Sequence, residues 1–346
     1  MLNSLGFSVY LTTFTQQWPA LLRWSGTGAP VFLSLHIGEE YGPDYVRQAE
    51  SVCGTLADNG FRIIADVSAR TLTLFDEPDL LRLARRLRIW ALRIDYGFET
   101  EEIRAMAEKM PIVLNASTTS PEIAQEIGGK EVYALHNFYP RPETGLDREY
   151  LKESTESLRA CGLQVQCFIP GDAQKRGPVF EGLPTLEQHR DVLPSAAFAD
   201  LVCNFSIHNI FVGDPGISQT EQERINRFCR ENILSVPALL EPMWESLYGQ
   251  VFTCRVDSPK LLVRFTESRT CACPGQTVEP HNCVARERGA ITIDNKAYGR
   301  YSGEVQMLRS PLKQDDRVNV IGRVPENAQL LMDCIGRGQK FVLVRP

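Results

Sequence analysis

Short apolar runs alternate with longer amphipathic segments over the first two-thirds of the chain. Eight of the runs have the composition of buried β-strands: Phe7–Leu11, Val31–His36, Arg62–Asp66, Ile89–Asp95, Ile112–Asn115, Val132–His136, Gln164–Ile169 and Asn209–Gly213. The segments between them place apolar residues at helical spacing, as in Tyr45–Asn59, Glu77–Leu87, Glu101–Lys109, Pro121–Ile127, Arg148–Cys161 and Pro194–Phe205. Eight strand–helix repeats over about 230 residues predict a closed (β/α)8 barrel.

An open, doubly wound parallel sheet is the structural alternative to the barrel. Sheets of that kind that bind nucleotides carry a glycine-rich turn after the first strand. The corresponding turn, Tyr10–Phe14, contains no glycine. The barrel is therefore the favoured fold.

The pattern changes after a predicted helix at Glu221–Glu231. From Val236 onwards, short apolar runs follow one another closely, with turns and no helical pattern between them. The runs are Leu261–Phe265, Ala290–Ile293, Val305–Leu308, Val318–Ile321 and Phe341–Val344. We therefore predict two domains, a (β/α)8 barrel over residues 1–235 and a small all-β barrel over residues 245–346.

Composition and charge say little about the fold, but they exclude some classes of partner. The 346 residues are 43% hydrophobic and 23% charged, and the formal net charge of −6 includes no polybasic run. We therefore expect neither a nucleic-acid partner nor a membrane partner. The N-terminus lacks the basic region of a signal peptide, and most of the 10 cysteines stand singly in apolar stretches, which favours a cytoplasmic protein with reduced thiols.

Polar side chains gather where the predicted strands end. The densest group lies in Leu135–Leu146, where a strand runs into imidazole, amide and phenol groups before two prolines and a glycine. In a (β/α)8 barrel the carboxyl ends of the strands form one rim, and the reacting groups lie there. The candidate rim residues are His36, Glu39, Asp66, Asp95, Asn115, His136, Asn137, Tyr139, Asp172 and Asp214.

The residue types at this rim restrict the chemistry. No predicted strand end carries a lysine, the nearest being Lys175, so Schiff-base and pyridoxal chemistry are disfavoured and no cofactor is expected. His36 and His136 could bind a metal, but no compact triad of ligands accompanies them. We therefore expect no metal in the barrel.

Paired carboxylates with amide donors fit glycoside hydrolysis, in which one carboxyl group protonates the leaving oxygen. Asp95 has two candidate partners in the sequence. Asp66 ends the neighbouring strand, and Asp172 follows a strand on the other side of the rim. Both pairings are open at this point.

Positive charges near the later strands predict an anion site. Arg141, Arg176 and the loop Gly171–Gly177 offer guanidinium groups and backbone amides in the region that often binds phosphate in such barrels. Arg269, at a strand end of the second domain, is a further candidate.

The second domain also contains a cysteine cluster. Cys271, Cys273 and Cys283, with His281, could hold zinc, but the spacing lacks the second Cys-x2–4-Cys knuckle of most structural sites. We favour free cysteines.

Several motifs occur in one order along both domains: Ile64–Val67, Arg93–Phe98, Leu114–Ser117, His136–Pro140, Thr144–Leu146, Gly182–Glu187 and Gly299–Glu304. On these residues the chain resembles a bacterial family whose members include 6-phospho-N-acetylmuramidases. The resemblance implies a (β/α)8 barrel followed by a cyclophilin-like β-barrel. It also implies hydrolysis of 6-phospho-N-acetylmuramyl-N-acetylglucosamine during cytoplasmic recycling of cell-wall sugars.

The resemblance suggests a catalytic or substrate-binding role for most of the candidate residues. Asp95 is the first choice for general acid, with Asp66, Glu39 or Asp172 as its carboxylate partner. If the 2-acetamido group of the substrate is the nucleophile, the partner orients it instead of attacking. The expected substrate-binding residues are Asn115, His136, Asn137, Tyr139, Arg141, Arg176, Asp214 and Arg269.

Two other functions are compatible with the same rim. One is a phosphosugar isomerase or epimerase, and the other is a non-enzymatic protein that binds a sugar phosphate. A homodimer is left open as well.

Overall fold

The computed structural model describes residues 4–36, 42–129, 131–268 and 277–346. The chain divides into two compact units. The first comprises Met1–Arg190 and Phe205–Ser218, and the second comprises Asp191–Asn204 and Gln219–Pro346. The predicted domain limits at residues 235 and 245 stay a prediction.

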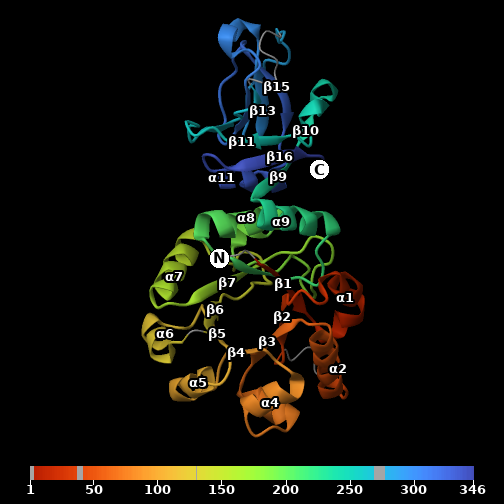
Figure 1. Ribbon diagram of the computed structural model, residues 1–346, viewed down its shortest axis with the longest axis vertical. Coiled ribbons are helices and arrows are strands. Elements are labelled where there is room, and N and C mark those ends of the chain that lie inside the picture. The colour runs from red at the N-terminus through yellow and green to blue at the C-terminus, as the bar shows by residue number, and fades with distance from the viewer. Residues whose placement is uncertain (1–3, 37–41, 130, 269–276) are drawn as a thin grey trace. The chain divides into compact units, whose positions relative to one another are not determined.

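The first unit contains a closed barrel of eight parallel strands that pair in sequence order. The strands are β1 (Ser4–Val9), β2 (Pro30–Ser34), β3 (Arg62–Val67), β4 (Ala91–Ile94), β5 (Ile112–Asn115), β6 (Val132–Leu135), β7 (Gln164–Ile169) and β8 (Asn209–Val212). Figure 1 shows helices around these strands, namely α1 (Phe14–Leu21), α2 (Tyr45–Asp58), α3 (Ala69–Phe75), α4 (Leu80–Leu87), α5 (Thr100–Ala107), α6 (Pro121–Ile127) and α7 (Arg148–Ala160). The predicted (β/α)8 barrel is confirmed.

Helix starts follow the capping residues. Asp79, Ser120 and Asp147 precede α4, α6 and α7, and their side-chain oxygens accept the backbone N–H three residues on at 2.8, 3.4 and 2.7 Å. The helix predicted over Glu77–Leu87 therefore begins later, after Asp79. The predicted helices do not include α1, which has Pro19 inside it and no capping side chain, or α3.

Two layers of side chains fill the barrel. The apolar layer takes one residue from each of β2 to β8, namely Phe32, Ile64, Ala91, Val113, Leu135, Phe168 and Phe211. On β1, a Cβ atom at Gly6 would lie 2.5 Å from the Phe211 ring, so only glycine leaves room for that ring. Side chains two positions apart on a strand share a face. Of the seven residues two positions further on, five are polar, namely Ser34, Asp66, Arg93, Asn115 and Asn137.

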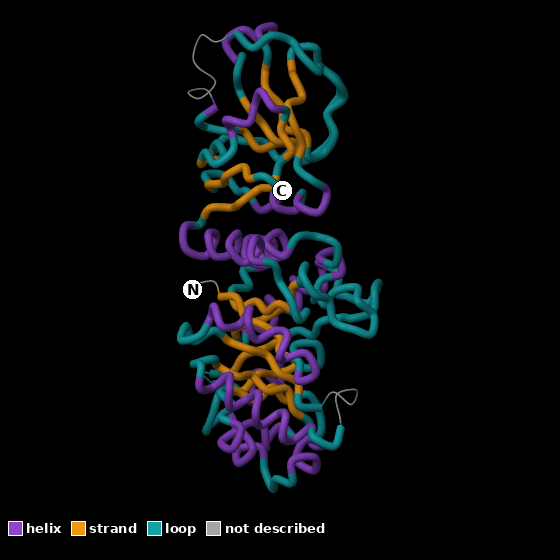
Figure 2. Tube along the Cα trace, turned by 90° about the vertical axis from the view of Figure 1, so that its right-hand side faces the viewer, coloured by secondary structure: helices purple, strands orange, loops and turns teal. Residues whose placement is uncertain are grey.

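The second unit contains two sheets. The larger has the antiparallel order β10 (Leu239–Leu240), β15 (Val318–Arg323), β13 (Ala290–Asp294), β14 (Val305–Leu308), β12 (Leu262–Arg264). The smaller has the order β11 (Val251–Thr253), β16 (Lys340–Val344), β9 (Ile233–Pro237), with β16 parallel to β9. Figure 2 shows loops and short helices joining these strands. The unit also includes α9 (Gln219–Glu231) and nearly all of α8 (Pro194–Phe205).

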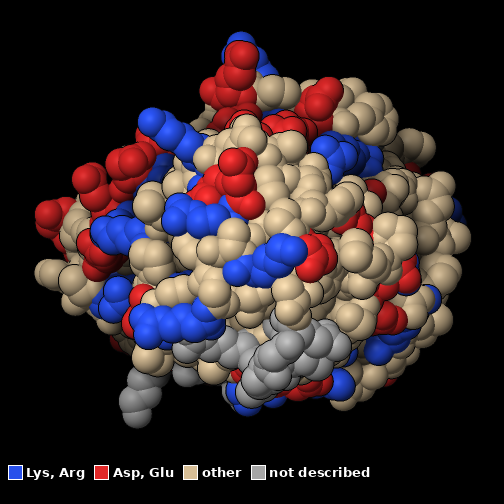
Figure 3. All heavy atoms as spheres, turned by 90° about the horizontal axis from the view of Figure 1, so that it is seen from above, with Lys and Arg blue, Asp and Glu red and all other residues tan. Residues whose placement is uncertain are grey.

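The predicted all-β region is confirmed, with two corrections. The short strands β9, β10 and β11 were not predicted. A short helix, α11 (Leu330–Cys334), lies between β15 and β16, where no helix was expected; its 5 residues are too few for a helical period to show. Acidic and basic side chains are interspersed on the face of the molecule seen in Figure 3.

An aromatic cluster joins the two sheets of the second unit. Phe252 lies on β11, Phe341 lies on β16, and Phe265 directly follows β12. Their ring centroids are 4.7–6.0 Å apart, and all three side chains are fully buried. Large buried rings of this kind supply much of the apolar area that stabilises a small domain.

A buried polar row crosses the larger sheet. Thr292 donates to the side-chain oxygen of Gln306 at 2.9 Å, and Gln306 donates to the Asp294 carboxylate at 3.3 Å. Burial, together with the nearby Glu304 carboxylate, raises the pKa of Asp294 to about 7. A carboxyl group that binds its proton more tightly in the folded chain than in the unfolded chain lowers stability as the pH rises.

We expect Asp294→Asn to stabilise the second unit at pH 8 but not at pH 4. The folded-state pKa near 7 lies above the ordinary value of 3.8, so wild-type stability should fall between these pH values. The amide keeps an acceptor for Gln306 and carries no charge, and the expected gain is on the order of 2 kcal/mol at pH 8. Calorimetric unfolding across pH 4–8 measures it. The exposed Asp257→Asn is the control and should show no such gain; equal pH slopes in wild type and Asp294→Asn would contradict the prediction.

Candidate active site

A cavity of about 650 Å³ opens at the carboxyl ends of the barrel strands. One part of its lining is polar, with Ser34, His36, Asp66, Arg93, Asp95, Asn137, Tyr139 and Arg176. The remainder is mostly apolar, with Phe32, Phe138, Pro140, Phe168, Gly177, Pro178, Val179 and Leu183. Such a lining, apolar with a few convergent polar groups, is typical of small-molecule sites.

Arg93 is the centre of the polar part. Its side chain on β4 is 4% exposed, and its Nη1 lies 2.6 Å from Asp66 Oδ1 on β3. Its Nη2 donates to the side-chain oxygen of Asn137. A buried guanidinium is costly unless it is paired, so these contacts hold Asp66 and Asn137 in place.

Asp95 lies one layer nearer to solvent, two positions after Arg93. Its side chain is 25% exposed, against 9% for Asp66. Asn115 Nδ2 donates to Asp95 Oδ1 at 2.9 Å, and Arg93 Nη1 lies 3.7 Å from the same oxygen. His36 Nε2 lies 3.5 Å from Asp66 Oδ2 and 3.6 Å from Asp95 Oδ2. The structure therefore brings Asp66 and Asp95 together.

Asp172 does not line this cavity. Its carboxylate lies in the exposed loop after β7 and accepts the backbone N–H of Ser218 at 2.7 Å. An aspartate that follows a strand commonly binds a nearby backbone amide in this way. Of the two pairings open in the sequence, only Asp66 with Asp95 is assembled.

His136, a predicted substrate-binding residue, does not line this cavity either. The side chain is fully buried, and neither ring nitrogen has a hydrogen-bond partner among the described residues. Burial lowers the pKa of His136 to about 4, and the positive charge of Arg93 adds to the effect. His136 follows Leu135, so it points to the opposite face of the strand from Leu135 and Asn137.

Of the other predicted binding residues, some line the cavity and some do not. Asn137 and Tyr139 line the cavity, and the Tyr139 hydroxyl lies 3.4 Å from that of Ser117. Asn115 acts on the site through Asp95. Arg141 is exposed and does not line the cavity.

Arg176 reaches the cavity from the loop after β7. Its guanidinium lies over the Tyr10 ring, 4.4 Å from the centroid. Among the described residues, no carboxylate lies within ion-pair distance of it. Arg176 is therefore a cation available to an anionic ligand.

Asp214 binds backbone amides of this loop. Its buried carboxylate accepts the backbone N–H groups of Gly171, Arg176 and Leu183 at 2.8–3.0 Å. Burial raises the pKa of Asp214, although the three hydrogen bonds oppose the shift. Its contact with substrate stays a prediction.

An ion pair missed by the sequence analysis joins the loops after β6 and β7. Glu187 accepts the backbone N–H groups of Glu143 and Gly145 at 2.8 and 2.7 Å. Arg190 donates to both Glu187 oxygens at 2.7 Å and to the backbone oxygens of Tyr139 and Arg141. The hydrogen bonds from Arg190, together with those from the two loop amides, lower the pKa of Glu187 to about 2.

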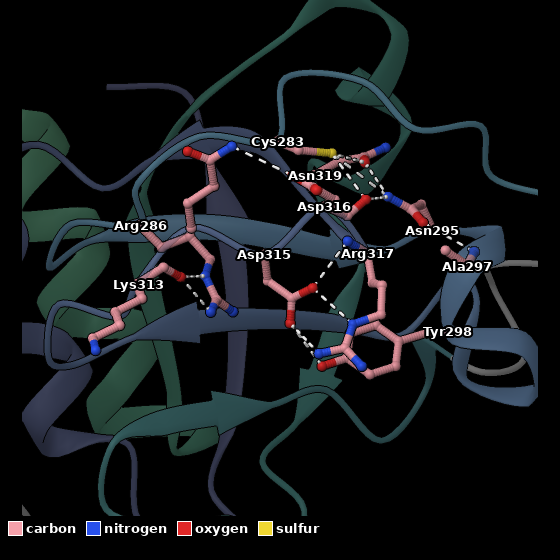
Figure 4. Close-up of polar contacts among 11 residues, drawn as sticks. Cys283, Arg286, Asn295, Ala297, Tyr298, Lys313, Asp315, Asp316, Arg317 and Asn319 are labelled. Carbon is pink, nitrogen blue, oxygen red and sulfur yellow. Dashed lines mark hydrogen bonds and ion pairs between the residues drawn. The ribbon is translucent and has the colours of Figure 1, made fainter.

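The cysteine cluster of the second unit is only partly described. Figure 4 shows the Cys283 thiol against the backbone oxygen of Asp316 at 3.3 Å and the side-chain oxygen of Asn319 at 3.4 Å. Asn295 donates to the same Asn319 oxygen at 2.9 Å. Four predicted residues, Glu39, Arg269, Cys271 and Cys273, lie outside the described residues.

We expect Glu187→Gln to destabilise the barrel, because it removes the carboxylate that pairs with both sides of the buried Arg190 guanidinium. Allowing for the partial exposure of Glu187, the expected loss is about 2 kcal/mol in the free energy of unfolding at pH 7. The depressed pKa means that wild type holds this contribution above its ordinary value of 4.5 and loses it as the pH falls towards 2. The variant should therefore approach wild type in acid.

Denaturant unfolding at pH 7 and pH 3 measures both effects. Glu156→Gln is the matched control, because Glu156 is exposed and lies 4.0 Å from Lys152. Equal losses in the two variants at pH 7 would disprove the role of the ion pair.

None of the described helices is long and apolar enough to cross a bilayer. Residues 5–227 match the profile of the family described as 6-phospho-N-acetylmuramidase, N-terminal. Residues 237–344 match its counterpart, 6-phospho-N-acetylmuramidase, C-terminal. No curated protein matches the chain.

Two solved structures are similar over both chains. A conserved protein of unknown function from Enterococcus faecalis is 31% identical, with a TM-score of 0.85 over 99% of this chain and 96% of that chain. An uncharacterized B. cereus protein is 23% identical, with a TM-score of 0.78 over 100% of both chains, and shows the fold alone. From the two profile matches, the chain belongs to the 6-phospho-N-acetylmuramidase family and is a glycosidase.

Proposed function

We propose that the chain hydrolyses 6-phospho-N-acetylmuramyl-N-acetylglucosamine to 6-phospho-N-acetylmuramic acid and N-acetylglucosamine. The observation that carries the proposal is the pair Asp66 and Asp95, held by Arg93 at the wall of a cavity of about 650 Å³. Two carboxyl groups that flank a scissile bond are what glycoside hydrolysis requires. Membership of the family supports the choice of sugar.

Asp95 is the general acid in this proposal. It is the more exposed of the two carboxyl groups, with a side chain 25% exposed against 9% for Asp66. It gives its proton to the glycosidic oxygen as the bond from that oxygen to the anomeric carbon breaks. In the second half of the reaction it takes a proton from the attacking water.

Asp66 orients the substrate and does not attack it. Arg93 occupies its Oδ1 at 2.6 Å, and the Ser34 hydroxyl donates to its Oδ2 at 3.3 Å. A carboxylate with both oxygens engaged is a poor nucleophile but can accept the N–H of the 2-acetamido group. The acetamide oxygen then bonds to the anomeric carbon, and water opens the resulting oxazoline.

Retention of configuration follows from this arrangement. One oxygen of Asp66 and one of Asp95 lie 2.6 and 3.7 Å from the same nitrogen of Arg93. Carboxyl groups held this close support a retaining mechanism, because inverting enzymes place theirs about 6.5 Å or more apart to hold a water molecule.

The 6-phosphate binds at Arg176, and Asn137 and Tyr139 hold hydroxyl groups of the sugar. The reaction takes place in the cytoplasm, during recycling of cell-wall sugars, and the second domain is cyclophilin-like. The resemblance in sequence supports these points. The eight described cysteines are all free thiols, which supports the cytoplasm alone.

We expect Asp95→Asn to lower kcat at least 100-fold for release of N-acetylglucosamine from the phosphorylated disaccharide. The amide has the shape of the carboxyl group but cannot donate its proton. Asp172→Asn is the matched control and should stay within about twofold of wild type.

Four outcomes would contradict the proposal. Release of no N-acetylglucosamine by wild type would exclude the reaction, and equal losses in Asp95→Asn and Asp172→Asn would exclude the assignment of the acid. Exchange of a carbon-bound proton of a monosaccharide phosphate with solvent would indicate an isomerase or epimerase. Thermal stabilisation by the sugar phosphate with no product would indicate a binding protein.

We expect Arg176→Met to raise KM for the phosphorylated disaccharide about 10- to 100-fold, because it removes the cation and keeps the apolar stem. The unphosphorylated disaccharide should lose no more than about twofold in kcat/KM. Arg141→Met, in an exposed residue outside the cavity, is the control. Equal losses on both substrates would exclude a phosphate at Arg176.

A further inference from the structure

His36 contacts both carboxyl groups of the cavity. Its Nε2 lies 3.5 Å from Asp66 Oδ2 and 3.6 Å from Asp95 Oδ2, and its side chain is 17% exposed. The residue lies two positions after Ser34, at the same height in the barrel as Asp95, which lies two positions after Arg93. Its Nδ1 has no hydrogen-bond partner among the described residues.

The negative charge that forms on Asp95 during the reaction needs a cation close to it. Arg93 lies against Asp66 at 2.6 Å but is 3.7 Å from Asp95. When Asp95 gives up its proton, its new negative charge appears beside the charge already on Asp66. Two neighbouring carboxylates repel each other strongly in a partly buried site. A second cation between them would remove this repulsion.

We propose that His36, as an imidazolium, is a positioning residue that stabilises the carboxylate formed when Asp95 protonates the leaving oxygen. The inference rests on the proposed function. In the step, the proton moves from Asp95 to the glycosidic oxygen, which keeps the electron pair of the broken bond. His36 keeps its own proton throughout and directs Nε2–H at Asp95.

The groups that face His36 come from two elements. Asp66 is on β3, Arg93 is on β4, and Asp95 and Tyr96 directly follow β4; the Tyr96 ring centroid lies 6.1 Å from that of His36. Protons on His36 and Asp95 are both needed for turnover. Because the groups interact, the apparent titrations belong to the cluster and not to one residue.

We expect His36→Gln to lower kcat about 10- to 100-fold with little change in KM. Above the pH optimum, log kcat/KM of wild type should fall with a slope of −2, because two protons are lost, whereas the variant should fall with a slope of −1. His36→Lys, which keeps its charge to higher pH, should recover part of kcat with a slope of −1. His281→Gln, in the second unit, is the control. A slope of −2 in His36→Gln, or a change in KM alone, would overturn the role.

A titration without substrate separates this inference from the proposed function. The chain has only 5 histidines, so the imidazole NMR signals can be assigned by substitution. In Asp95→Asn, loss of the carboxylate should move the midpoint of the His36 titration to lower pH by about one unit, and Asp172→Asn should leave it in place. An unmoved midpoint in Asp95→Asn overturns the inference whatever the substrate is. A moved midpoint in an enzyme that releases no N-acetylglucosamine shows that the proposed function is the part that fails.

Discussion

The need to pair one buried charge determines the layout of the site. Arg93 enters the barrel from the middle of β4 and is almost completely shielded from water. A guanidinium in that position is tolerated only where carboxylate and amide oxygens surround it. Asp66, Asn137 and, at longer range, Asp95 supply those oxygens from three different segments. The geometry that suits a glycosidase is thus also the geometry that lets the fold hold the charge.

Much of the fold could be predicted, because strand alternation and helical spacing are local patterns. All eight barrel strands lie at the predicted places, and so do five strands of the second unit. The missed strands are short, and β9 owes its existence to parallel pairing with β16, about a hundred residues away. A local sequence pattern cannot predict a strand that depends on a partner so far along the chain.

The site was predictable where strand position decides it. Asp66, Asp95, Asn115 and Asn137 lie together at the cavity, as their positions at the strand ends predict. His136 does not line the cavity, because it lies one position before Asn137 and successive side chains point to opposite faces of a strand. The carboxylates of Asp172 and Asp214 accept hydrogen bonds from loop backbone amides, and a sequence does not show such contacts. The pair Glu187 and Arg190 likewise depends on loop contacts that no local pattern predicts.

The closure of the barrel has a consequence for its assembly. The first and last strands meet where Ser4 donates a hydrogen bond to Asn209, 205 positions along the chain, and where Phe211 fills the space left at Gly6. Contacts between such distant segments form late, since the entropy of closing so long a loop must be overcome first. During synthesis on the ribosome, one edge of β1 therefore stays unpaired until β8 is made, nearly two hundred residues later. Until β8 arrives, the growing protein exposes an open sheet edge, which is the stage at which it is most exposed to aggregation.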